Sequence, residues 1–366
     1  MMKIKELINY LEQVAPLAYQ ESYDNVGLLV GSDQTEITKA LVTLDCTEAV
    51  IEEAIQNNCN LVIAHHPIIF GGIKKLNGKN YVERTIILAI KNNIAIYAIH
   101  TNLDNVIHGV NAKIAEKLGL NQTKILDKKT GSLQKLVTYA PQQYAEQIKN
   151  ALFEAGAGNI GNYSECSFSL IGEGSFKANN MAKPFLGEIG QRHLETETRI
   201  EVILPAHLSS KIMHALQLAH PYEEVAYDFF TLLNENHEIG SGLIGNLPEP
   251  MDQNTFLAYL KEKMELNVIR YTNINNKNIS KIAVCGGAGS FLLKKAIQQG
   301  ADAFVSADFK YHEFFDAENH LMIADIGHYE SENFTKSLIS EMITKKFPTF
   351  AILLSKIETN PINYYY

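Results

Sequence analysis

The sequence predicts an α/β fold made of two related α/β units, with an α+β domain inserted between them. Short apolar runs that end in polar residues alternate with helical segments in residues 1–126 and again in 241–366. This alternation is typical of mostly parallel sheets covered by helices. Residues 127–240 instead follow a βαββαβ order, which is the ferredoxin-like pattern. We therefore expect three domains with these boundaries.

Each element of the first unit follows from a local pattern. Apolar residues at helical spacing predict an amphipathic helix over 3–13, and Asp24-Asn25-Val26-Gly27 predicts a turn before a short strand. Strands are expected at 40–44, 61–64 and 94–99, and helices at 81–92, at 110–118 and in a segment ending at Gln56.

The insert and the last unit are divided in the same way. In the insert we expect strands at 133–139, 166–174, 196–204 and 226–232, and helices at 142–154 and 209–218. In the last unit we expect strands at 281–285, 303–306 and 321–324, a helix ending at Gln298, and a long helix with Glu332 in its first turn.

The two outer parts align without a gap when residue numbers are shifted by 242. Leu41 then falls on Ala283, and residues 61–64 fall on 303–306. This register predicts a repeated strand–helix–strand unit that the insert interrupts. Chance matching of two such segments is the alternative.

Composition excludes several classes of protein. The 366 residues are 46% hydrophobic and 20% charged, with a net charge of −9 and a pI near 5.8, so no basic footprint predicts nucleic-acid binding. Four scattered cysteines without a CxxC pair fit a reducing cytoplasm. The N-terminal segment lacks the apolar centre of a signal peptide, and no run reaches the length of a membrane span. We expect a cytoplasmic protein without a membrane segment.

Metal-competent side chains stand where predicted strands end. His65 and His66 follow the strand at 61–64, Asp104 lies in the exit loop of the strand at 94–99, and His328 and Glu332 follow the strand at 321–324. Open α/β sheets place their ligands at the carboxyl ends of strands. The alternative for the histidine pair is two polar loop residues bonded to backbone.

Three imidazoles and two carboxylates form a mixed nitrogen and oxygen donor set. Such a set suits zinc, iron or manganese. Five ligands are too many for one catalytic ion with an open position, but they suit two divalent ions if Glu332 bridges them. A pair of ions about 3.5–4 Å apart can activate a water molecule and polarise its target.

Several short motifs in this chain match those of a known family. They are Ser22-Tyr23-Asp24-Asn25-Val26-Gly27, Asp45-Cys46-Thr47, Ala64-His65-His66-Pro67, His100-Thr101-Asn102-Leu103-Asp104 and Asp325-Ile326-Gly327-His328-Tyr329-Glu330-Ser331-Glu332. In this combination the chain resembles the GTP cyclohydrolase 1 type 2 homolog family, also called NIF3-like proteins. The segment around His220-Pro221-Tyr222-Glu223-Glu224 resembles the PII/CutA-like insert of longer members.

The resemblance implies roles for the five residues. By it, His66 and Asp104 would hold one ion, His65 and His328 would hold the other, and Glu332 would bridge. It also implies a homohexamer with the sites facing an internal chamber, and a metal-dependent hydrolase acting on a nucleotide or related heterocycle. The alternative function is a non-enzymatic, metal-binding scaffold or regulatory protein.

Three further segments carry open alternatives. Lys310 and His312 follow the strand at 303–306 and are candidates for catalytic or phosphate contacts, or else begin a solvated helix. The glycine-rich segment 286–290 is either a phosphate cradle at a helix start or a tight packing turn. Asp45 and Thr47 either orient histidines or cap a helix.

Overall fold

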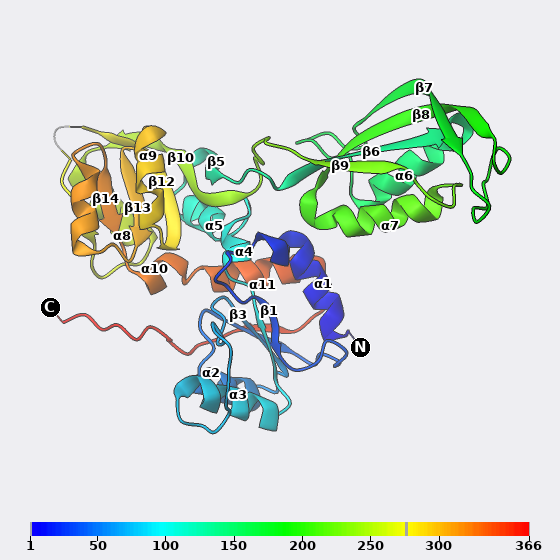
Figure 1. Ribbon diagram of the computed structural model, residues 1–366. Coiled ribbons are helices and arrows are strands. Elements are labelled where there is room, and N and C mark those ends of the chain that lie inside the picture. The colour runs from blue at the N-terminus through cyan, green and yellow to red at the C-terminus, as the bar shows by residue number, and fades with distance from the viewer. Residues whose placement is uncertain (1, 275–276, 366) are drawn as a thin grey trace. The chain divides into compact units, whose positions relative to one another are not determined.

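The chain consists of two compact units. The computed structural model describes residues 2–274 and 277–365. The outer unit combines the chain up to Lys128 with the chain from Glu238 onward, and Lys129–His237 forms the insert (Figure 1).

The first sheet of the outer unit has five strands in the order β1-β4-β3-β2-β15. Strands β2, β3 and β4 are parallel, β15 joins β2 in the same direction, and β1 is antiparallel to β4. The strands are β1 (Gly27–Val30), β2 (Ala40–Thr43), β3 (Leu61–Ala64), β4 (Ala95–Ala98) and β15 (Ile352–Leu354). The helices before and between them are α1 (Ile4–Val14), α2 (Glu48–Gln56), α3 (Tyr81–Lys91), α4 (Thr101–Asp104) and α5 (Val110–Lys117).

The second sheet has six strands in the order β11-β14-β13-β12-β10-β5. Strands β12, β13 and β14 are parallel, and the other neighbours are antiparallel. The strands are β5 (Asn121–Lys128), β10 (Gly240–Met251), β11 (Arg270–Tyr271), β12 (Ile279–Ala288), β13 (Ala303–Ala307) and β14 (Met322–Asp325). Its helices are α8 (Gln253–Lys263), α9 (Leu293–Gln298), α10 (His328–Glu332) and α11 (Thr335–Lys346), with 3₁₀ turns η4 (Ser290–Leu292) and η5 (Tyr311–Ala317).

The shift of 242 residues holds in the paired strands of both sheets. Ala40 pairs with Leu61 in the first sheet, and Ile282 pairs with Ala303 in the second. The helical segments between these strands, α2 and η4 with α9, also correspond under the same shift. The two outer parts of the chain therefore share one strand–helix–strand geometry.

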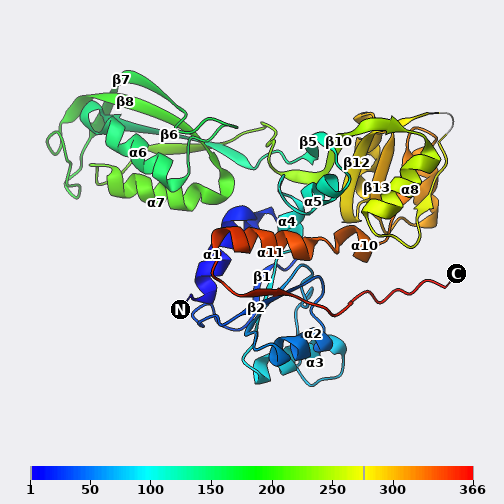
Figure 2. The ribbon, with the colours of Figure 1, turned by 180° about the vertical axis from the view of Figure 1, so that it is seen from behind.

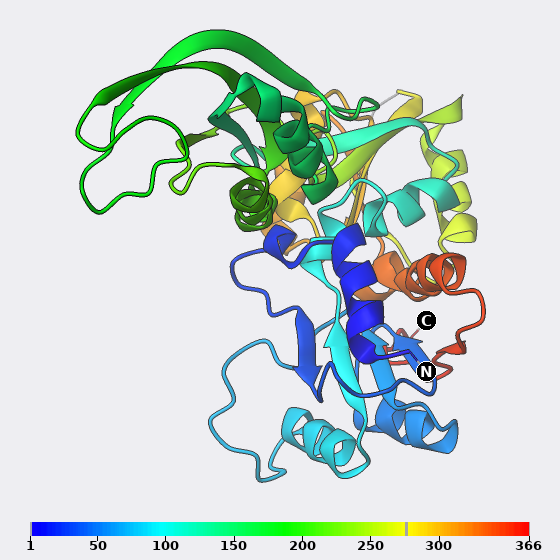
Figure 3. The ribbon, with the colours of Figure 1, turned by 90° about the vertical axis from the view of Figure 1, so that its right-hand side faces the viewer.

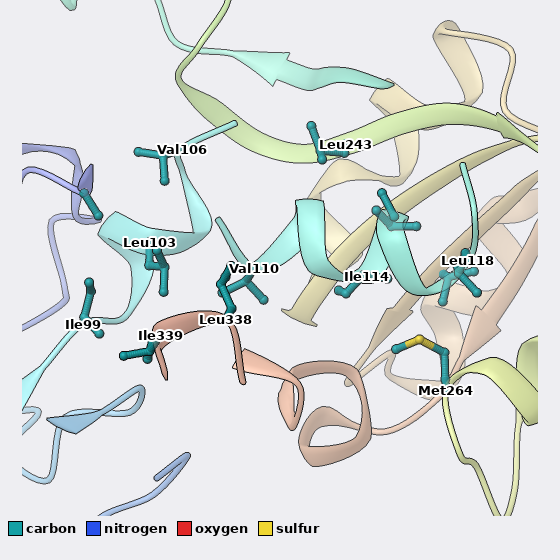
Figure 4. Packing of buried hydrophobic residues seen from close by; sticks show 14 of the residues in the cluster. Ile99, Leu103, Val106, Val110, Ile114, Leu118, Leu243, Met264, Leu338 and Ile339 are labelled. Atoms are coloured by element: carbon teal, nitrogen blue, oxygen red, sulfur yellow. The ribbon is translucent and has the colours of Figure 1, made fainter. Parts of the chain in front are cut away.

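One apolar core joins the two sheets. Buried residues of α4 and α5, among them Leu103, Val110 and Ile114, belong to the same cluster as Ile63 of β3 and Val284 of β12 (Figure 4). Burying such side chains stabilises the folded state by about 1.5–3 kcal/mol each. The sheets are thus parts of one unit and hold the strand ends of both in fixed positions.

The chain also crosses between the sheets at two points. Strand β5 follows the first sheet along the chain but pairs with β10 in the second, whereas the C-terminal β15 returns to β2 (Figure 2). These crossings were not predicted, because β5 is polar and exposed over its first four residues and β15 is only three residues long. The predicted α/β class is confirmed. The second sheet, however, mixes parallel and antiparallel strands, whereas a mostly parallel sheet was expected.

Two predicted local structures differ from those observed. The expected exit loop after β4 contains the short helix α4, which ends at Asp104. The expected long helix is divided into α10 and α11, so Glu332 ends α10 and does not lie in the first turn of a long helix. Asn333 and Phe334 separate the two helices while keeping helical backbone angles. No helix among the described residues is both long and apolar enough to span a membrane.

The insert is a four-stranded antiparallel sheet with two helices. Its elements are β6 (Leu133–Pro141), α6 (Ala145–Ala155), β7 (Ser167–Lys177), β8 (Arg192–Pro205), α7 (Ser209–Ala219) and β9 (Tyr227–Thr231), with strand order β7-β8-β6-β9. Leu136 and Val202 of the sheet pack with Ile148 and Ile212 of the two helices. The long β7–β8 pair is curved, as Figure 3 shows.

The two points at which the insert joins the outer unit lie next to each other. Lys128 and Gly240 are cross-strand partners in the β5–β10 pair, so a short turn can join them. Replacing Lys129–His237 by a five-residue Gly/Ser loop should leave a soluble protein with one cooperative thermal unfolding transition. Insoluble expression, or a broad transition without cooperativity, would contradict the independence of the outer unit.

Candidate metal centre

Five side chains from both sheets meet at the carboxyl ends of parallel strands. His65 and His66 follow β3, Asp104 closes α4 after β4, and His328 and Glu332 are the first and last residues of α10 after β14. His65 is fully buried and Glu332 is only 2% exposed. The two sheets therefore bring together the residues that the sequence singled out.

The Glu332 carboxylate lies at the centre of this group. Its Oε2 is 2.9 Å from His66 Nε2 and 3.0 Å from His328 Nε2, and its Oε1 is 3.8 Å from His65 Nε2. The Nε2 atoms of His66 and His328 lie 3.3 Å apart. The two oxygens of one carboxylate thus face different histidines.

Two buried atoms at this centre lack hydrogen-bond partners. They are His65 Nε2 and Asp104 Oδ1, which lie 3.6 Å apart. Buried polar atoms in proteins are nearly always partnered, so two such atoms facing each other indicate a binding position for a ligand. A cation fits, because both atoms are ordinary metal ligands.

The donor atoms form overlapping groups that could hold a metal ion. The His65–Asp104–Glu332 group and the His66–His328–Glu332 group each have their donor atoms within 4.8 Å of one another. A third such group combines His65 and His66 with His100. Glu332 is the ligand shared by the first two groups.

The far side of each histidine ring is fixed by a hydrogen bond. His65 Nδ1 donates to Ile99 O at 2.8 Å. His66 Nδ1 lies 2.8 Å from Asp45 Oδ1, and His328 Nδ1 lies 2.7 Å from Asp308 Oδ2. Such contacts set the tautomer and turn each Nε2 toward the centre, as in metal sites of known proteins.

Protonation of the histidines compensates the buried carboxylate when no cation is bound. Burial disfavours a charged ring, but the hydrogen bonds with Asp45 and Glu332 raise the pKa of His66 to about 10. The pKa of His328 rises to about 9 against the same burial, because Glu332 and Asp308 bond its ring. Burial alone would raise the pKa of Glu332, yet the histidines hold it well below its usual range. A bound cation would replace these protons.

The pairing of ligands differs from the one that the resemblance implies. Asp104 lies next to His65 and not next to His66, and His328 lies next to His66. The reason is local, since His65 bonds Ile99 in the segment that leads from β4 to α4 and Asp104. The geometry therefore groups His65 with Asp104 and His66 with His328.

Lys310 and His312 do not line the cavity beside this centre. Both are exposed, and the His312 ring packs against the rings of Tyr311 and Phe315. Asp308, two residues before Lys310, is the member of this segment that reaches the centre. Its positive φ of 58° turns it toward His328. Its place directly after β13 is the only sequence signal that could have identified it.

The two alternatives for the segment after β2 are both realised, by different residues. Asp45 bonds His66, and Thr47 caps α2 by accepting a hydrogen bond from Val50 N. Thr359 in the C-terminal segment donates to Asp45 Oδ2 at 2.6 Å. No sequence signal predicts Thr359, because it lies 314 residues from its partner.

The glycine-rich segment 286–290, at the end of β12, is a packing turn. Gly286 N donates to Asn111 Oδ1 and Gly287 N donates to Ser331 Oγ, so these two amides are not free to hold a phosphate. A Cβ on Gly287 would lie 2.5 Å from Glu332 Oε1. The glycine makes room for the central carboxylate.

Asp24 and His100 support the centre from the first sheet. Asp24 bonds His100 Nδ1 at 2.9 Å and also accepts hydrogen bonds from the backbone N–H and the hydroxyl of Thr101. Burial opposes the charge of Asp24, but these bonds lower its pKa to about 2. Asp24 lies in a predicted turn and His100 in a predicted loop, so neither role was expected.

A cavity of about 350 Å³ opens beside the centre. Residues of both sheets and their loops line it: Glu21, Tyr23, Asp45, His66, Phe70, His100, Thr101, Asp104, Asn105, Asn111, Ser241, Gly242, Cys285, Gly286, Ala288, Phe291, His328 and Glu332.

The whole chain is similar to proteins of one family. A family model described as Duf34/NIF3 (NGG1p interacting factor 3) matches residues 2–361. The GTP cyclohydrolase 1 type 2 homolog of Bacillus subtilis (strain 168) is 39% identical over 366 residues, with 98% of each chain covered. The structure of a Bacillus cereus protein related to NIF3 matches with a TM-score of 0.85 at 36% identity, covering 100% of this chain and 99% of that one. Staphylococcus aureus protein SA1388 matches over the same shares with a TM-score of 0.78 at 31% identity.

Gly287→Ala should disturb the centre through its contact with Glu332. The matched control is Gly300→Ala, because Gly300 has a similar positive φ of 71° but a Cβ there meets nothing within 4 Å. Gly287→Ala should lower the free energy of unfolding by about 1–3 kcal/mol more than the control does, the usual cost of overpacking. Chemical denaturation of both variants measures the difference. Equal losses would show that backbone strain alone matters.

Asp24→Asn should make the free energy of unfolding less dependent on pH in the acid range. The native carboxyl has a pKa of about 2 against an ordinary value of 3.8, which corresponds to about 2 kcal/mol of stability at pH 7. This contribution is present above pH 4 and is lost as the pH falls through 2. The variant should therefore be less stable at pH 7 and converge with the native protein near pH 2. Urea denaturation in chelator measures this, with exposed Asp316→Asn as control.

Proposed function

The chain belongs to the Duf34/NIF3 family, and from this premise we propose that it binds two divalent metal ions. His65 and Asp104 would hold one ion, and His66 and His328 would hold the other. Glu332 would bridge them with its two oxygens. The observation that carries this proposal is the pair of unpartnered buried atoms facing a carboxylate that is shared with a second ligand group.

The donor set limits the identity of the ions. Imidazole nitrogens and carboxylate oxygens without a thiolate suit zinc, iron or manganese. Cys285 lines the cavity, but its Sγ lies 3.4 Å from Gly286 O, and burial raises the pKa of its thiol, which disfavours the thiolate. The protein's own contribution is to hold each ring by Asp45, Asp308 or the Ile99 carbonyl.

The reaction that this centre supports best is hydrolysis of a nucleotide or related heterocycle. Bound divalent ions would supply Lewis-acid chemistry and lower the pKa of a water molecule. The cavity gives a small molecule access to His66, Asp104, His328 and Glu332. Relatives carry the name GTP cyclohydrolase 1 type 2 homolog, which agrees with this class.

The assembly and the insert complete the proposal. We propose a homohexamer in the cytoplasm, in which residues 127–240 contain a PII/CutA-like domain of ferredoxin-like fold. The observed βαββαβ order and the strand order β7-β8-β6-β9 support that fold. The common pairing register of β2–β3 and β12–β13 supports two related outer units, for which we propose the boundaries 1–126 and 241–366.

Metal content should separate the two sites. His65→Ala should lose the ion shared with Asp104, and His66→Ala should lose the ion shared with His328. Glu332→Ala should lower the binding affinity for both ions, by more than the roughly 10–100-fold loss that is typical when a residue behind a metal ligand is changed. Elemental analysis after dialysis against chelator measures each variant, with exposed His320→Ala as control. Two tightly held ions in Glu332→Ala would contradict the bridge.

The same preparations test the hydrolase. Native protein with two ions per chain should hydrolyse at least one compound in a screen of nucleotides and related heterocycles, and Glu332→Ala should lose that activity. A fully loaded protein that turns over none of them would instead favour a metal-binding scaffold.

A further inference from the structure

We infer that the cavity beside the metal centre takes an uncharged, planar nitrogen heterocycle, at the level of a nucleobase or nucleoside, and discriminates against polyphosphates. The inference narrows the substrate class of the proposed function and rests on its two ions. Three features of the cavity wall carry it: the aromatic side chains, the charge and the hydrogen-bonding groups.

Three large aromatic side chains stand exposed around the cavity. Tyr23 is 69% exposed, Phe70 is 55% exposed and Phe291 is 68% exposed. They come from three separate segments, namely the turn before β1, the loop after β3 and the turn η4. Exposed aromatic groups gathered at one cavity indicate a binding surface, because they offer flat faces on which a ring can stack.

Two of these aromatic segments are held in place by specific contacts. Asn25 Nδ2 donates to Ile69 O at 2.7 Å, which ties the loop of Phe70 to the turn of Tyr23. The Phe70 ring meets the His100 ring edge-on, with centroids 5.8 Å apart. Held side chains lose little entropy when they receive a ligand.

The charge of the wall does not suit a polyphosphate. Four carboxylates line the cavity, from Glu21, Asp45, Asp104 and Glu332, and no lysine or arginine among the described residues does. Two divalent ions would bring four positive charges, which these carboxylates match. No excess positive charge is then left for a triphosphate, whose protein sites usually supply arginine, lysine or free backbone amides.

The hydrogen-bonding groups of the wall favour a donor-bearing ligand. Two of these carboxylates are not assigned to the ions. Glu21 accepts from Asn105 Nδ2, and Asp45 bonds His66 and Thr359, but a carboxylate oxygen has two lone pairs and can accept a further hydrogen bond from a ring N–H or an exocyclic amino group, whereas phosphate oxygens are themselves acceptors. The neutral amides are already engaged, since Asn105 Oδ1 accepts from Ser241 Oγ and Asn111 Oδ1 accepts from Gly286 N. A volume of about 350 Å³ is near the lower end of the roughly 300–1,000 Å³ range of small-molecule sites.

Calorimetric titration of the full-length, metal-loaded protein tests the inference. The probes are adenosine, guanosine and cytidine, the triphosphate of each, and inorganic tripolyphosphate, in a phosphate-free buffer. Metal content is measured in every sample. At least one nucleoside should bind, its triphosphate should bind at least ten-fold more weakly, and tripolyphosphate should not compete with the nucleoside.

Variants connect binding to the aromatic surface. Phe291→Ala should weaken nucleoside binding about ten-fold, within the range for loss of one stacked ring. Phe291→Leu should do the same while keeping an apolar side chain, which separates stacking from a folding defect. Phe315→Ala, 65% exposed but away from this cavity, is the matched control and should bind normally.

Four other results would each contradict the inference or the proposed function. A triphosphate that binds ten-fold more tightly than its nucleoside, or a loaded protein that binds no nucleoside, would refute the inference and leave the metal proposal intact. A Phe291 variant with altered mass by light scattering and unchanged nucleoside affinity would make this surface a subunit interface, and refute it too. Absence of metal from the native protein would refute the proposed function and the charge argument together.

Discussion

The buried carboxylate of Glu332 is the constraint on which the site depends. Removing such a group from water costs several kcal/mol unless nearby charges and hydrogen bonds compensate it. The compensation comes from His65, His66 and His328, which reach Glu332 from the ends of β3 and β14. An uncompensated Glu332 would be unstable at 2% exposure, so the centre needs either protonated histidines or a cation.

This requirement explains why two sheets share one core. The ligands come from strand ends of both sheets, so their distances are fixed only if the sheets cannot move apart. The common cluster around α4 and α5 provides this, and the crossings of β5 and β15 tie each half of the chain to the other's sheet. The insert leaves this arrangement intact, because its attachment points are neighbours across the β5–β10 pair.

Sequence reasoning identified what is local and missed what is distant. The central strands could be predicted because buried apolar runs end in polar residues, and the five residues of the centre because parallel strands end at one edge. Roles that depend on contacts across the chain could not. Asp24 and Asp308 bond histidines 76 and 20 residues away, and Thr359 bonds Asp45, the partner of His66, across 314 residues. Each of the three has an ordinary local explanation as a turn, helix-start or tail residue.

The absence of lysine and arginine from the described lining of the cavity follows from the same buried charge. A lysine or arginine within reach of Glu332 or Asp104 would form an ion pair with it and occupy the position that a metal ion requires. A wall of carboxylates, hydroxyls and aromatic rings avoids this competition. The net charge at the centre therefore depends on which ions bind there. The flat apolar faces of Tyr23, Phe70 and Phe291 can contact the rest of a ligand and select it by shape. Metal retention and ligand selectivity are in this way assigned to different side chains of one cavity.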